Sequence, residues 1–344
     1  MSDAYTRAGV NRDTENETKA GMASALETSD ARVLNKIGAF ATLYDGHFPE
    51  YKHPILVLKT EEPGTKQLLA LQNDSVETVC ADLINHLVND CIVMGARPLS
   101  IQDCIVCGKV EKPIVLRMVS AFAEAAKKNE CTLTGGETSW QPGVIPEGTY
   151  ILTASIVGVV EKENIIDGSK IQEGDVVLAL ESSGVHTNGV SLVRKLIETK
   201  PEILNETLDG KPFIKAVLEP HRAYYTALKG LFGKDGLVGL AHITGGGIPE
   251  NLDRILPGKL DAEIDLSKIR VLPLFKLLKK IGELDDADML RTFNMGVGIA
   301  AVVRADFADE AIRHLTAAGV PTYEIGKIVE GEKRVKWAGR LSWD

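Results

Sequence analysis

The chain has 344 residues, of which 44% are hydrophobic and 25% charged, and a formal net charge of −9 at pH 7. This composition is typical of a globular protein with room for two domains rather than of a disordered chain. The negative charge argues against nonspecific binding to nucleic acid or to an anionic membrane, although a local pocket can still accept a phosphorylated small molecule. No apolar run has the length of a bilayer span, and the polar N-terminus lacks the core of a secretory signal, so we expect a cytoplasmic protein.

The first half of the chain predicts an alternation of strands and helices. The pattern predicts a buried strand at 55–58, which leads into a polar loop ending in Gly64-Thr65-Lys66. An amphipathic helix begins at residue 76 and ends before Gly95 and Pro98. The pattern then predicts a strand at 99–106, a helix at 113–129 and strands at 131–134 and 150–160. Gly135-Gly136, taken in isolation, is typical of a tight turn.

The helix that begins at residue 76 carries an unusual polar face. At 100° per residue, one stripe holds Asp82, Asn85, His86, Asn89 and Asp90, while apolar residues occupy the opposite side. Lysine and glutamate, which are common on solvated helix faces, are absent from this stripe. The two aspartates lie about 12 Å apart along the helix, too far to share one metal ion but able to hold separate cations along a polyphosphate. We therefore favour a functional face over a solvated one.

Five cysteines lie in the first half, an odd number that cannot be fully paired within one chain. Cys104 and Cys107 have CxxC spacing, but no second cysteine or histidine pair follows at the distance of a zinc site. Both fall in the predicted strand, where residues three apart point to opposite faces. We therefore expect buried thiols rather than a metal or redox site.

The second half again alternates strands with helices. Residues 161–174 are charged and rich in turn formers, so we take them as the linker between domains at 1–165 and 175–344. The pattern beyond the linker predicts strands at 175–180, 299–303 and 321–328 and helices at 190–199, 221–231, 272–281 and 307–318, with a further helix opening near residue 247. Both halves are therefore expected to be α/β or α+β layers of a sheet and helices.

Loops of the second half concentrate hydroxyls, histidines and glycines. These loops are Ser182-Ser183-Gly184, His186-Thr187-Asn188-Gly189 and, after His242, Thr244-Gly245-Gly246-Gly247. Consecutive glycines before a helix can direct N–H groups at an anion, although a purely structural turn remains an equal alternative. His186 and His242 are each either an acid–base group or an ordinary loop histidine. The chain lacks the nucleophile-elbow, zincin and dinucleotide motifs.

Acidic groups recur in the first half at Glu61, Glu62, Asp82, Asp90 and Glu137. Mg²⁺ prefers carboxylate oxygens together with water and substrate phosphate, so separated acids that converge on a nucleotide would suit it. Gly64-Thr65-Lys66 adds a flexible backbone, a hydroxyl and an ammonium group, but without the full spacing of a phosphate-binding loop.

Taken together and in order, these motifs resemble the phosphoribosylformylglycinamidine cyclo-ligase family, also called aminoimidazole ribonucleotide synthetases, of purine biosynthesis. The resemblance covers nearly the whole chain and is strongest from Asp167 to Gly298. It is carried by Tyr5-Thr6-Arg7-Ala8-Gly9-Val10, Gly64-Thr65-Lys66, Val88-Asn89-Asp90, Gly135-Gly136-Glu137-Thr138, Ile165-Ile166-Asp167-Gly168, the two histidine loops and Arg291-Thr292-Phe293-Asn294-Met295-Gly296-Val297-Gly298.

The resemblance implies a homodimer whose N-terminal sheets join into a barrel, with ATP and Mg²⁺ in the N-terminal half and an α/β sandwich as the C-terminal half. The implied reaction phosphorylates the formyl amide oxygen of formylglycinamidine ribonucleotide. An amidine nitrogen then attacks, phosphate leaves and the imidazole ring closes. Phosphorylation is needed because an amide oxygen is a poor leaving group, and catalysis then consists mainly of positioning and charge neutralisation.

The resemblance also implies a role for individual residues. ATP contacts are expected from Gly64, Thr65, Lys66 and Asn89, and cation ligands from Glu61, Asp82, Asp90 and Glu137. Contacts to the phosphoribosyl substrate are expected from Ser183, His186, Thr187, Asn188, His242, Thr244, Asn294 and the triplet Gly245, Gly246 and Gly247, which we assign to the ribose phosphate. The expected catalytic groups are His186 and Lys66.

The departures from the family pattern lie in the ATP-binding half. Thr60-Glu61-Glu62-Pro63 stands where the family has Thr-Asp-Gly-Val, Ser139-Trp140-Gln141-Pro142 replaces Ala-Glu-Met-Pro, and the glycine-rich leader is thinned to Ile37-Gly38-Ala39-Phe40. The chain is thus either an active cyclo-ligase with a retuned ATP site or a dimeric relative that binds a ribonucleotide without the ATP chemistry. A sister enzyme such as thiamine-monophosphate kinase or selenophosphate synthetase is disfavoured by the His186 and His242 motifs. We favour the cyclo-ligase because the main acids and Lys66 are retained.

Overall fold

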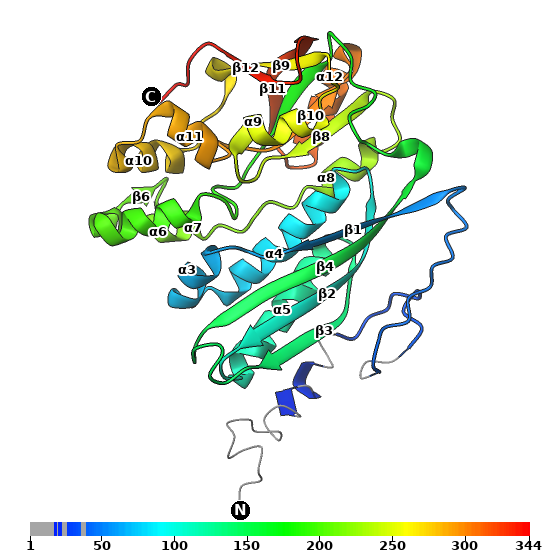
Figure 1. The fold of residues 1–344 in the computed structure, drawn as a ribbon, viewed down its shortest axis with the longest axis vertical. Coiled ribbons are helices and arrows are strands. Elements are labelled where there is room, and N and C mark those ends of the chain that lie inside the picture. Colours follow the sequence, from blue (N-terminus) through cyan, green and yellow to red (C-terminus); the bar gives the residue numbers. More distant parts are fainter. Residues whose placement is uncertain (1–16, 19, 23–25, 36–38) are drawn as a thin grey trace, which may run out of the picture.

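The computed structural model describes residues 17–18, 20–22, 26–35 and 39–344. The motif Tyr5–Val10 and part of the leader Ile37–Phe40 lie outside the described residues. Strands and helices form two halves, each built on its own sheet, with the C-terminal half above the N-terminal half in Figure 1. The predicted α/β fold with a sheet and helices in each half is confirmed. Within the described part of the chain, no helix combines the length and the apolar character that a membrane span requires.

The first sheet has four strands, and its helices pack on one of its faces. The strand order is β1 (Pro54–Glu61), β4 (Tyr150–Glu161), β2 (Arg97–Cys107) and β3 (Thr132–Trp140). Only β2 and β3 are parallel, and α5 (Lys112–Lys128) connects them as a crossover helix. The other helices of this half are α3 (Lys66–Gln72) and α4 (Val76–Ile92).

The second sheet has six strands, mainly antiparallel. Their order is β12 (Val335–Ala338), β9 (Leu260–Asp265), β11 (Thr322–Glu330), β5 (Val176–Glu181), β10 (Val297–Val303) and β8 (Leu237–His242). The helices of this half are α6 (Val190–Thr199), α7 (Phe213–Val217), α8 (Tyr225–Leu228), α9 (Gly247–Leu252), α10 (Pro273–Gly282), α11 (Asp286–Thr292) and α12 (Ala308–Ala317). A short hairpin precedes α7; its strands, β6 (Thr207–Leu208) and β7 (Lys211–Pro212), have two residues each.

Helix α4 lies where the two halves meet (Figure 1). Its apolar side packs against β1, β4 and α5, and Cys80, Leu83, Leu87 and Cys91 on that side are fully buried. Its polar side faces the segment before α8 in the C-terminal half. The helix ends near Gly95, whose φ of 77° is unfavourable for other residues, as the sequence predicted.

Three local predictions are wrong. The strand predicted as buried at 55–58 is the edge strand β1, whose residues alternate in exposure and leave Leu56 and Leu58 largely exposed. Gly135-Gly136 lies inside β3 and not in a turn, at a point where the pairing of β2 and β3 shifts register. A Cβ at Gly136 would stand 2.2 Å from the carbonyl oxygen of Asp103, so close strand packing explains this glycine. The predicted helix at 221–231 begins only at Tyr225, because side chains of α4 bind the backbone of the preceding residues.

All five cysteines, which lie in the described part of the chain, are unpaired. Cys80, Cys91, Cys107 and Cys131 are buried, and Cys104 is half-buried on β2. Burial raises the pKa of every one of these thiols, so they stay protonated and unreactive at neutral pH. This agrees with the expectation of buried thiols rather than a metal or redox site.

Candidate active site between the two halves

The polar stripe of α4 binds the backbone of the segment that leads into α8. Asn85 donates through Nδ2 to the carbonyl of His221 (2.6 Å), and Asn89 donates through Nδ2 to the carbonyl of Arg222 (2.8 Å). The N–H of Tyr224 in turn donates to Asn89 Oδ1 (3.2 Å). These bonds replace the intrahelical bonds that residues 221–224 would otherwise make. The stripe therefore connects the two halves of the molecule, and we call this contact between α4 and residues 221–224 the joint. Asn89, predicted to contact ATP, is fully buried in it.

Lys66 and Asp82 form a buried ion pair beneath the same joint. Lys66 Nζ lies 2.9 Å from Asp82 Oδ1 and also donates to the carbonyl of Glu219 (2.8 Å), while the N–H of His221 donates to Asp82 Oδ1 (2.7 Å). Both side chains are fully buried. Burial raises the pKa of Asp82 to about 6, although the Lys66 charge and these hydrogen bonds oppose the rise. The two charges thus neutralise each other here, and the predicted roles of Lys66 at a phosphate and Asp82 at a cation stay predictions.

Four histidines gather beside this pair. His86 and His186 precede the segment 221–224 in sequence, His221 begins it, and His242 follows it. His221 Nε2 and His242 Nε2 lie 2.9 Å apart, and the rings of His186 and His221 stack with centroids 3.8 Å apart. His242 Nδ1 lies 2.6 Å from Asp90 Oδ1, and His86 Nδ1 lies 3.0 Å from Thr187 Oγ1. All four imidazoles are buried. Contacts between α4 and loops of the C-terminal half therefore build one histidine cluster, which we define as His86, His186, His221 and His242.

The charge state of the cluster follows from its burial. Burial, followed by repulsion from His242, lowers the pKa of His86 to about 4. Burial likewise holds the pKa of His186 and of His221 well below the usual histidine value. For Asp90, burial opposes ionisation, but the hydrogen bond from His242 and nearby positive charges outweigh it and hold the pKa below its usual range. At neutral pH these three imidazoles are therefore neutral and Asp90 is ionised.

His186 has a buried hydrogen-bond donor without an acceptor. The N–H of Ser183 donates to His186 Nε2 (3.1 Å), so the neutral ring carries its hydrogen on Nδ1. Nδ1 is buried and has no hydrogen-bond partner among the described residues. His186 also adopts a φ of 57°, a left-handed conformation that is uncommon for residues other than glycine. An unsatisfied donor on a strained loop is a common sign of a functional position.

Two of the predicted cation ligands lie together, and Glu137 lies apart from them. Lys59 Nζ on β1 is 2.6 Å from Glu61 Oε1 and 3.1 Å from Asp90 Oδ2, so one ammonium group bridges the two carboxylates. Glu137 is exposed on β3, at the opposite edge of the same sheet. Three strand spacings separate β1 from β3, roughly 14 Å. Glu61 and Asp90 can therefore share a cation, whereas Glu137 cannot join them within one chain without a large movement.

The loops predicted to bind substrate meet the Gly64-Thr65 turn from the other side. Thr65 Oγ1 lies 3.2 Å from Ser191 Oγ at the start of α6, and the Gly64 backbone approaches the carbonyl of Thr187. Ser183 Oγ donates to the carbonyl of Pro220 (2.6 Å). The predicted ATP and substrate elements are thus neighbours in the fold.

The glycine triplet is held by Asn251 of α9. Asn251 Nδ2 donates to the carbonyls of Gly245 (3.1 Å) and Gly247 (2.7 Å), and Thr244 Oγ1 donates to Asn251 Oδ1 (3.1 Å). Gly246 and Gly247 have φ values of 88° and 65°. A Cβ at Gly247 would stand 2.0 Å from the carbonyl oxygen of Leu290, so this conformation requires glycine.

Asn188 and Asn294 occupy different parts of the loop region. A Cβ at Gly245 would lie 3.6 Å from Asn188 Oδ1, which places Asn188 against the triplet, and Asn188 Nδ2 is buried without a partner among the described residues. Asn294 is buried and donates to the carbonyl of Gly184 (2.9 Å), while Ser182 Oγ donates to Asn294 Oδ1 (3.0 Å). Asn188 is therefore free to bind a ligand, whereas Asn294 shapes the loop around Gly184.

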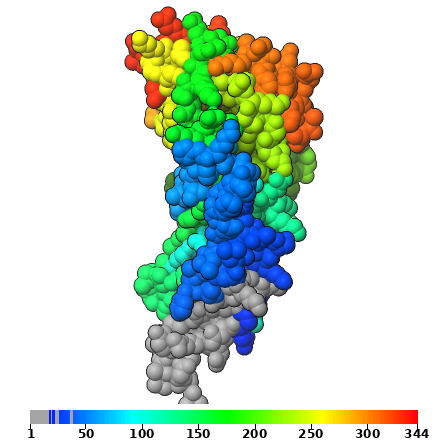
Figure 2. Space-filling view, turned by 90° about the vertical axis from the view of Figure 1, so that its right-hand side faces the viewer, coloured from blue at the N-terminus to red at the C-terminus, as the bar shows by residue number. Residues whose placement is uncertain are grey.

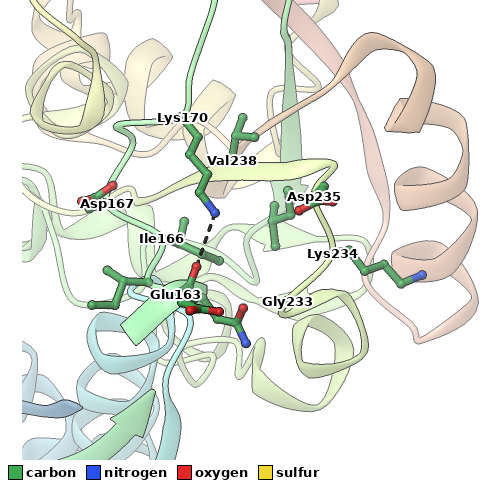
Figure 3. Close-up of a pocket in the computed structure, with 11 residues that line it drawn as sticks. Glu163, Ile166, Asp167, Lys170, Gly233, Lys234, Asp235 and Val238 are labelled. Atoms are coloured by element: carbon green, nitrogen blue, oxygen red, sulfur yellow. Dashed lines mark hydrogen bonds between the residues drawn. The ribbon is translucent and has the colours of Figure 1, made fainter. Parts of the chain in front are cut away.

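A separate cavity of about 290 Å³ lies between the segments Glu163–Lys170 and Gly233–Val238 (Figure 3). Lys170 Nζ donates across it to the carbonyl of Glu163 (3.4 Å). None of the residues predicted to bind ATP, cation or substrate lines this cavity. It therefore forms no part of the candidate site.

Sequence reasoning assigned no individual role to three residues of the site. His86 was visible on the polar stripe, one helical turn from Asp90, and the lack of lysine or glutamate around it was the available signal. Lys59 directly follows the strand predicted at 55–58, and in an extended chain Glu61, two residues later, lies on the same face. His221 had no signal, because only the tertiary fold brings it to His242.

Comparison with known proteins supports the similarity seen in the sequence. Family models match residues 50–160 (AIR synthase related protein, N-terminal domain) and 172–338 (AIR synthase related protein, C-terminal domain). A phosphoribosylformylglycinamidine cyclo-ligase of Burkholderia cenocepacia is 44% identical over 304 residues, covering 88% of this chain and 86% of that protein. Another, of Paraburkholderia xenovorans, is 43% identical over 328 residues, covering 95% and 92%.

Solved structures share the fold at low sequence identity. HypE of E. coli has a TM-score of 0.67 at 16% identity, covering 94% of each chain. A HypE in complex with ATP has a TM-score of 0.68 at 14% identity, covering 96% of this chain and 92% of that one. The thiamine-monophosphate kinase of Stenotrophomonas maltophilia has a TM-score of 0.65 at 16% identity, covering 95% and 96%. Likeness at this level of identity establishes the architecture alone.

Proposed function

The chain belongs to the phosphoribosylformylglycinamidine cyclo-ligases of the AIR synthase related family, and from this premise we propose how its two halves share the reaction. It is a ligase of purine biosynthesis that uses ATP to close the imidazole ring of formylglycinamidine ribonucleotide. Identity of 43–44% over about nine-tenths of the chain favours the active enzyme over a binding protein without ATP chemistry. In our proposal residues 1–165 bind ATP and form the dimer, and residues 175–344 hold the phosphoribosyl substrate.

The observation that carries this division is the direct contact between the two sets of predicted residues. Asp90 on α4 bonds to His242, and Thr187 bonds to His86, although these partners are more than 100 positions apart in sequence. An enzyme that transfers a phosphoryl group and then closes a ring needs nucleotide and substrate side by side. A joint lined from both halves meets this requirement.

Bound ATP supplies the phosphoryl group that makes the formyl amide oxygen a leaving group. Glu61 and Asp90 suit its Mg²⁺, because two carboxylates that already share the Lys59 ammonium form an oxygen-rich place for a hard cation. Thr65 offers its hydroxyl to a phosphate from the turn beside α6. Lys66 and Asp82, which pair with each other, hold the joint on which these groups depend.

His186 acts on the substrate in this proposal as a neutral hydrogen-bond donor. Its ring is neutral because burial lowers its pKa, and its Nδ1–H has no partner among the described residues. A fixed donor of this kind stabilises negative charge that develops on an oxygen, here the formyl amide oxygen. The neighbouring Asn188 and the glycine triplet are suited to the sugar phosphate.

The experiment that tests the proposed function is a direct assay of the purified protein. Formylglycinamidine ribonucleotide, ATP and Mg²⁺ are expected to give aminoimidazole ribonucleotide, with one ADP and one phosphate released per ring closed. ATP binding measured by calorimetry serves as the companion measurement. Nucleotide binding without ring closure, or no binding up to millimolar ATP, would contradict the proposal and favour the binding-protein alternative.

Replacing Gly246 by valine tests the assignment of the glycine triplet. The added side chain would stand 2.4 Å from Glu250 Oε2 at a φ that valine rarely adopts, so the loop must shift. The KM for the phosphoribosyl substrate is expected to rise far more than the KM for ATP. Gly174→Val is the matched control, because Gly174 has a similar φ of 87° and an added Cβ there would meet nothing within 4 Å. Equal increases in both KM values would refute the assignment.

The first sheet also offers a surface for the proposed homodimer. Its helices cover one face, and on β1 and β4 the other face exposes Leu56 (54%), Leu58 (70%) and Ile151 (40%). Strand β1 is also an edge strand and lies on the surface of the side shown in Figure 2. An apolar edge of this kind on a globular protein usually meets a partner. This supports pairing of two N-terminal sheets.

Leu58→Lys is expected to shift the protein from dimer to monomer, because each interface would then bury two lysine charges, one from each copy. Analytical ultracentrifugation at micromolar protein measures the change. Leu204→Lys is the control, since Leu204 is an exposed leucine (42%) in the C-terminal half. A dimer that survives Leu58→Lys unchanged would rule out this face as the interface.

A further inference from the structure

Four of the seven histidines of the chain gather in the cluster beside Asp90, and two sets of three side chains there bring metal-ligating atoms within 4.8 Å of one another. One set is His86, Asp90 and His242, and the other is His186, His221 and His242. We propose that His86, Asp90 and His242 form a binding site for one divalent transition-metal ion of the zinc class. The site shares Asp90 with the position proposed for the Mg²⁺ of ATP, so the two ions would compete for this carboxylate, but zinc binding can be measured without nucleotide or substrate.

Both histidines of the proposed site are oriented by a second hydrogen bond. His86 Nδ1 lies 3.0 Å from Thr187 Oγ1, which leaves Nε2 directed toward Asp90. His242 Nε2 lies 2.9 Å from His221 Nε2, which leaves Nδ1 directed toward the same carboxylate. Metal-ligating histidines nearly always have their other ring nitrogen held in this way. Thr187 and His221 therefore stand as the outer partners of the site.

The separations of the donor atoms are close to those of a metal site. His242 Nδ1 is 2.6 Å from Asp90 Oδ1, and His86 Nε2 is 3.8 Å from Asp90 Oδ2. Bonds of about 2.0–2.1 Å in a tetrahedral site place neighbouring ligand atoms about 3.3 Å apart, so the first pair must open by about 0.7 Å and the second must close by about 0.5 Å. Metal binding replaces the hydrogen bond from His242 Nδ1 to Asp90, so His242 then carries its hydrogen on Nε2 and donates it to His221, whose own hydrogen moves from Nε2 to Nδ1. Each of the two rings carries one hydrogen once the metal is bound.

The other set of three histidines is poorly arranged for one ion. The rings of His186 and His221 stack at an interplanar angle of 21°, so their in-plane lone pairs run side by side and do not converge on one point. His186 Nε2 already accepts the N–H of Ser183. These contacts favour the set that contains Asp90.

Two imidazoles and one carboxylate select the class of metal. Imidazole nitrogen suits zinc, copper, nickel and iron, whereas magnesium prefers oxygen ligands alone. The site is reached past Lys59, whose side chain is 38% exposed and contacts Asp90 Oδ2 at 3.1 Å. Metal binding displaces the Lys59 ammonium from this oxygen, and Glu61, 2.6 Å from the same ammonium, retains it.

Titration of the full-length protein with Zn²⁺ alone, in calorimetry without nucleotide, tests the proposal. We expect one ion per chain, loss of binding in His86→Gln and in His242→Gln, and affinity roughly 10- to 100-fold weaker in Thr187→Val, which removes only an outer partner. His53→Gln, on the exposed surface, and Cys104→Ser are the controls and should bind like the unaltered protein. Co²⁺ added in place of Zn²⁺ should give a visible absorption band that is lost in the same variants.

His186→Gln discriminates between the two sets, since it should retain the metal if Asp90 is a ligand. Loss of binding in His186→Gln together with retention in His86→Gln would overturn the proposal. So would the absence of Zn²⁺ binding up to millimolar concentration, or loss of binding in Cys104→Ser. Because Thr187→Val leaves all three ligands in place, its weakened binding supports the site even if a histidine variant fails to fold.

Discussion

Lys66→Met is expected to destabilise the folded protein by about 3–5 kcal/mol at neutral pH, because it leaves the Asp82 carboxylate buried without its counter-charge. Both side chains are fully buried, and Asp82 Oδ2 already lacks a hydrogen-bond partner among the described residues. Water therefore cannot take the place of the lost ammonium. Urea denaturation monitored by circular dichroism measures the change.

The loss of folding stability in Lys66→Met, which we call the deficit, should increase as the pH rises. The pKa of Asp82 is already raised to about 6 by burial, and removal of the Lys66 charge raises it further. A carboxyl whose pKa is higher in the folded state than in the unfolded state loses stability as pH rises through the folded pKa. The deficit should therefore be small at about pH 5, where Asp82 is protonated, and largest near pH 8.

The double variant Lys66→Met with Asp82→Leu is the control for this prediction. Replacing a whole buried pair by apolar residues is often neutral, so most of the lost stability should return. An unchanged urea midpoint in Lys66→Met, combined with a raised KM for ATP, would show that Lys66 serves the triphosphate and not the joint between the halves.

His186→Asn is expected to lower kcat by about 10²- to 10³-fold, the usual cost of removing one preorganised donor to a developing oxyanion. Asparagine tolerates the left-handed φ of 57° at this position, so the loop should keep its shape. Asparagine places its donor on a shorter side chain, away from the position of His186 Nδ1. Steady-state kinetics of ring closure measures the loss.

His314→Asn is the matched control, because His314 lies on α12, bonds to the carbonyl of Ala227 and has no contact with the histidine cluster. It should leave kcat unchanged. A decrease in kcat of less than a few fold in His186→Asn, with the urea midpoint preserved, would exclude His186 as a donor to the reacting oxygen.

Most helices and strands were predictable because their signals are local. The apolar spacing of α4 and the proline at the start of α5 depend on residues within a few turns of each other. Two of the three wrong predictions share one cause, which is a partner distant in sequence, and the third, burial of β1, failed because strand order places β1 at the edge of its sheet. Gly135-Gly136 forms a strand because β2 pairs with it, and His221 is not helical because Asn85 and Asp82 bind its backbone.

The same distinction holds for the candidate site. Composition and motifs identified Asp90, His186, His242 and the glycine triplet as candidates, since their residue types alone suit phosphate, cation and proton chemistry. Sequence offered no means of knowing that His221 would lie 2.9 Å from His242 or that Glu137 would lie across the sheet from Glu61. These positions follow from strand order and from the packing of α4 against the second half.

The amino-acid sequence by itself determined the family, the α/β character of both halves and the kinds of side chain available for chemistry, because each depends on residue identity and short spacing. Only the tertiary structure decided which of those side chains pair with each other, as Lys66 does with Asp82. It also decided which keep a donor or acceptor without a partner among the described residues, as His186 does. The physical reason is that hydrogen bonds and buried ion pairs form only between atoms a few ångströms apart. Segments distant in sequence come this close only when the chain folds.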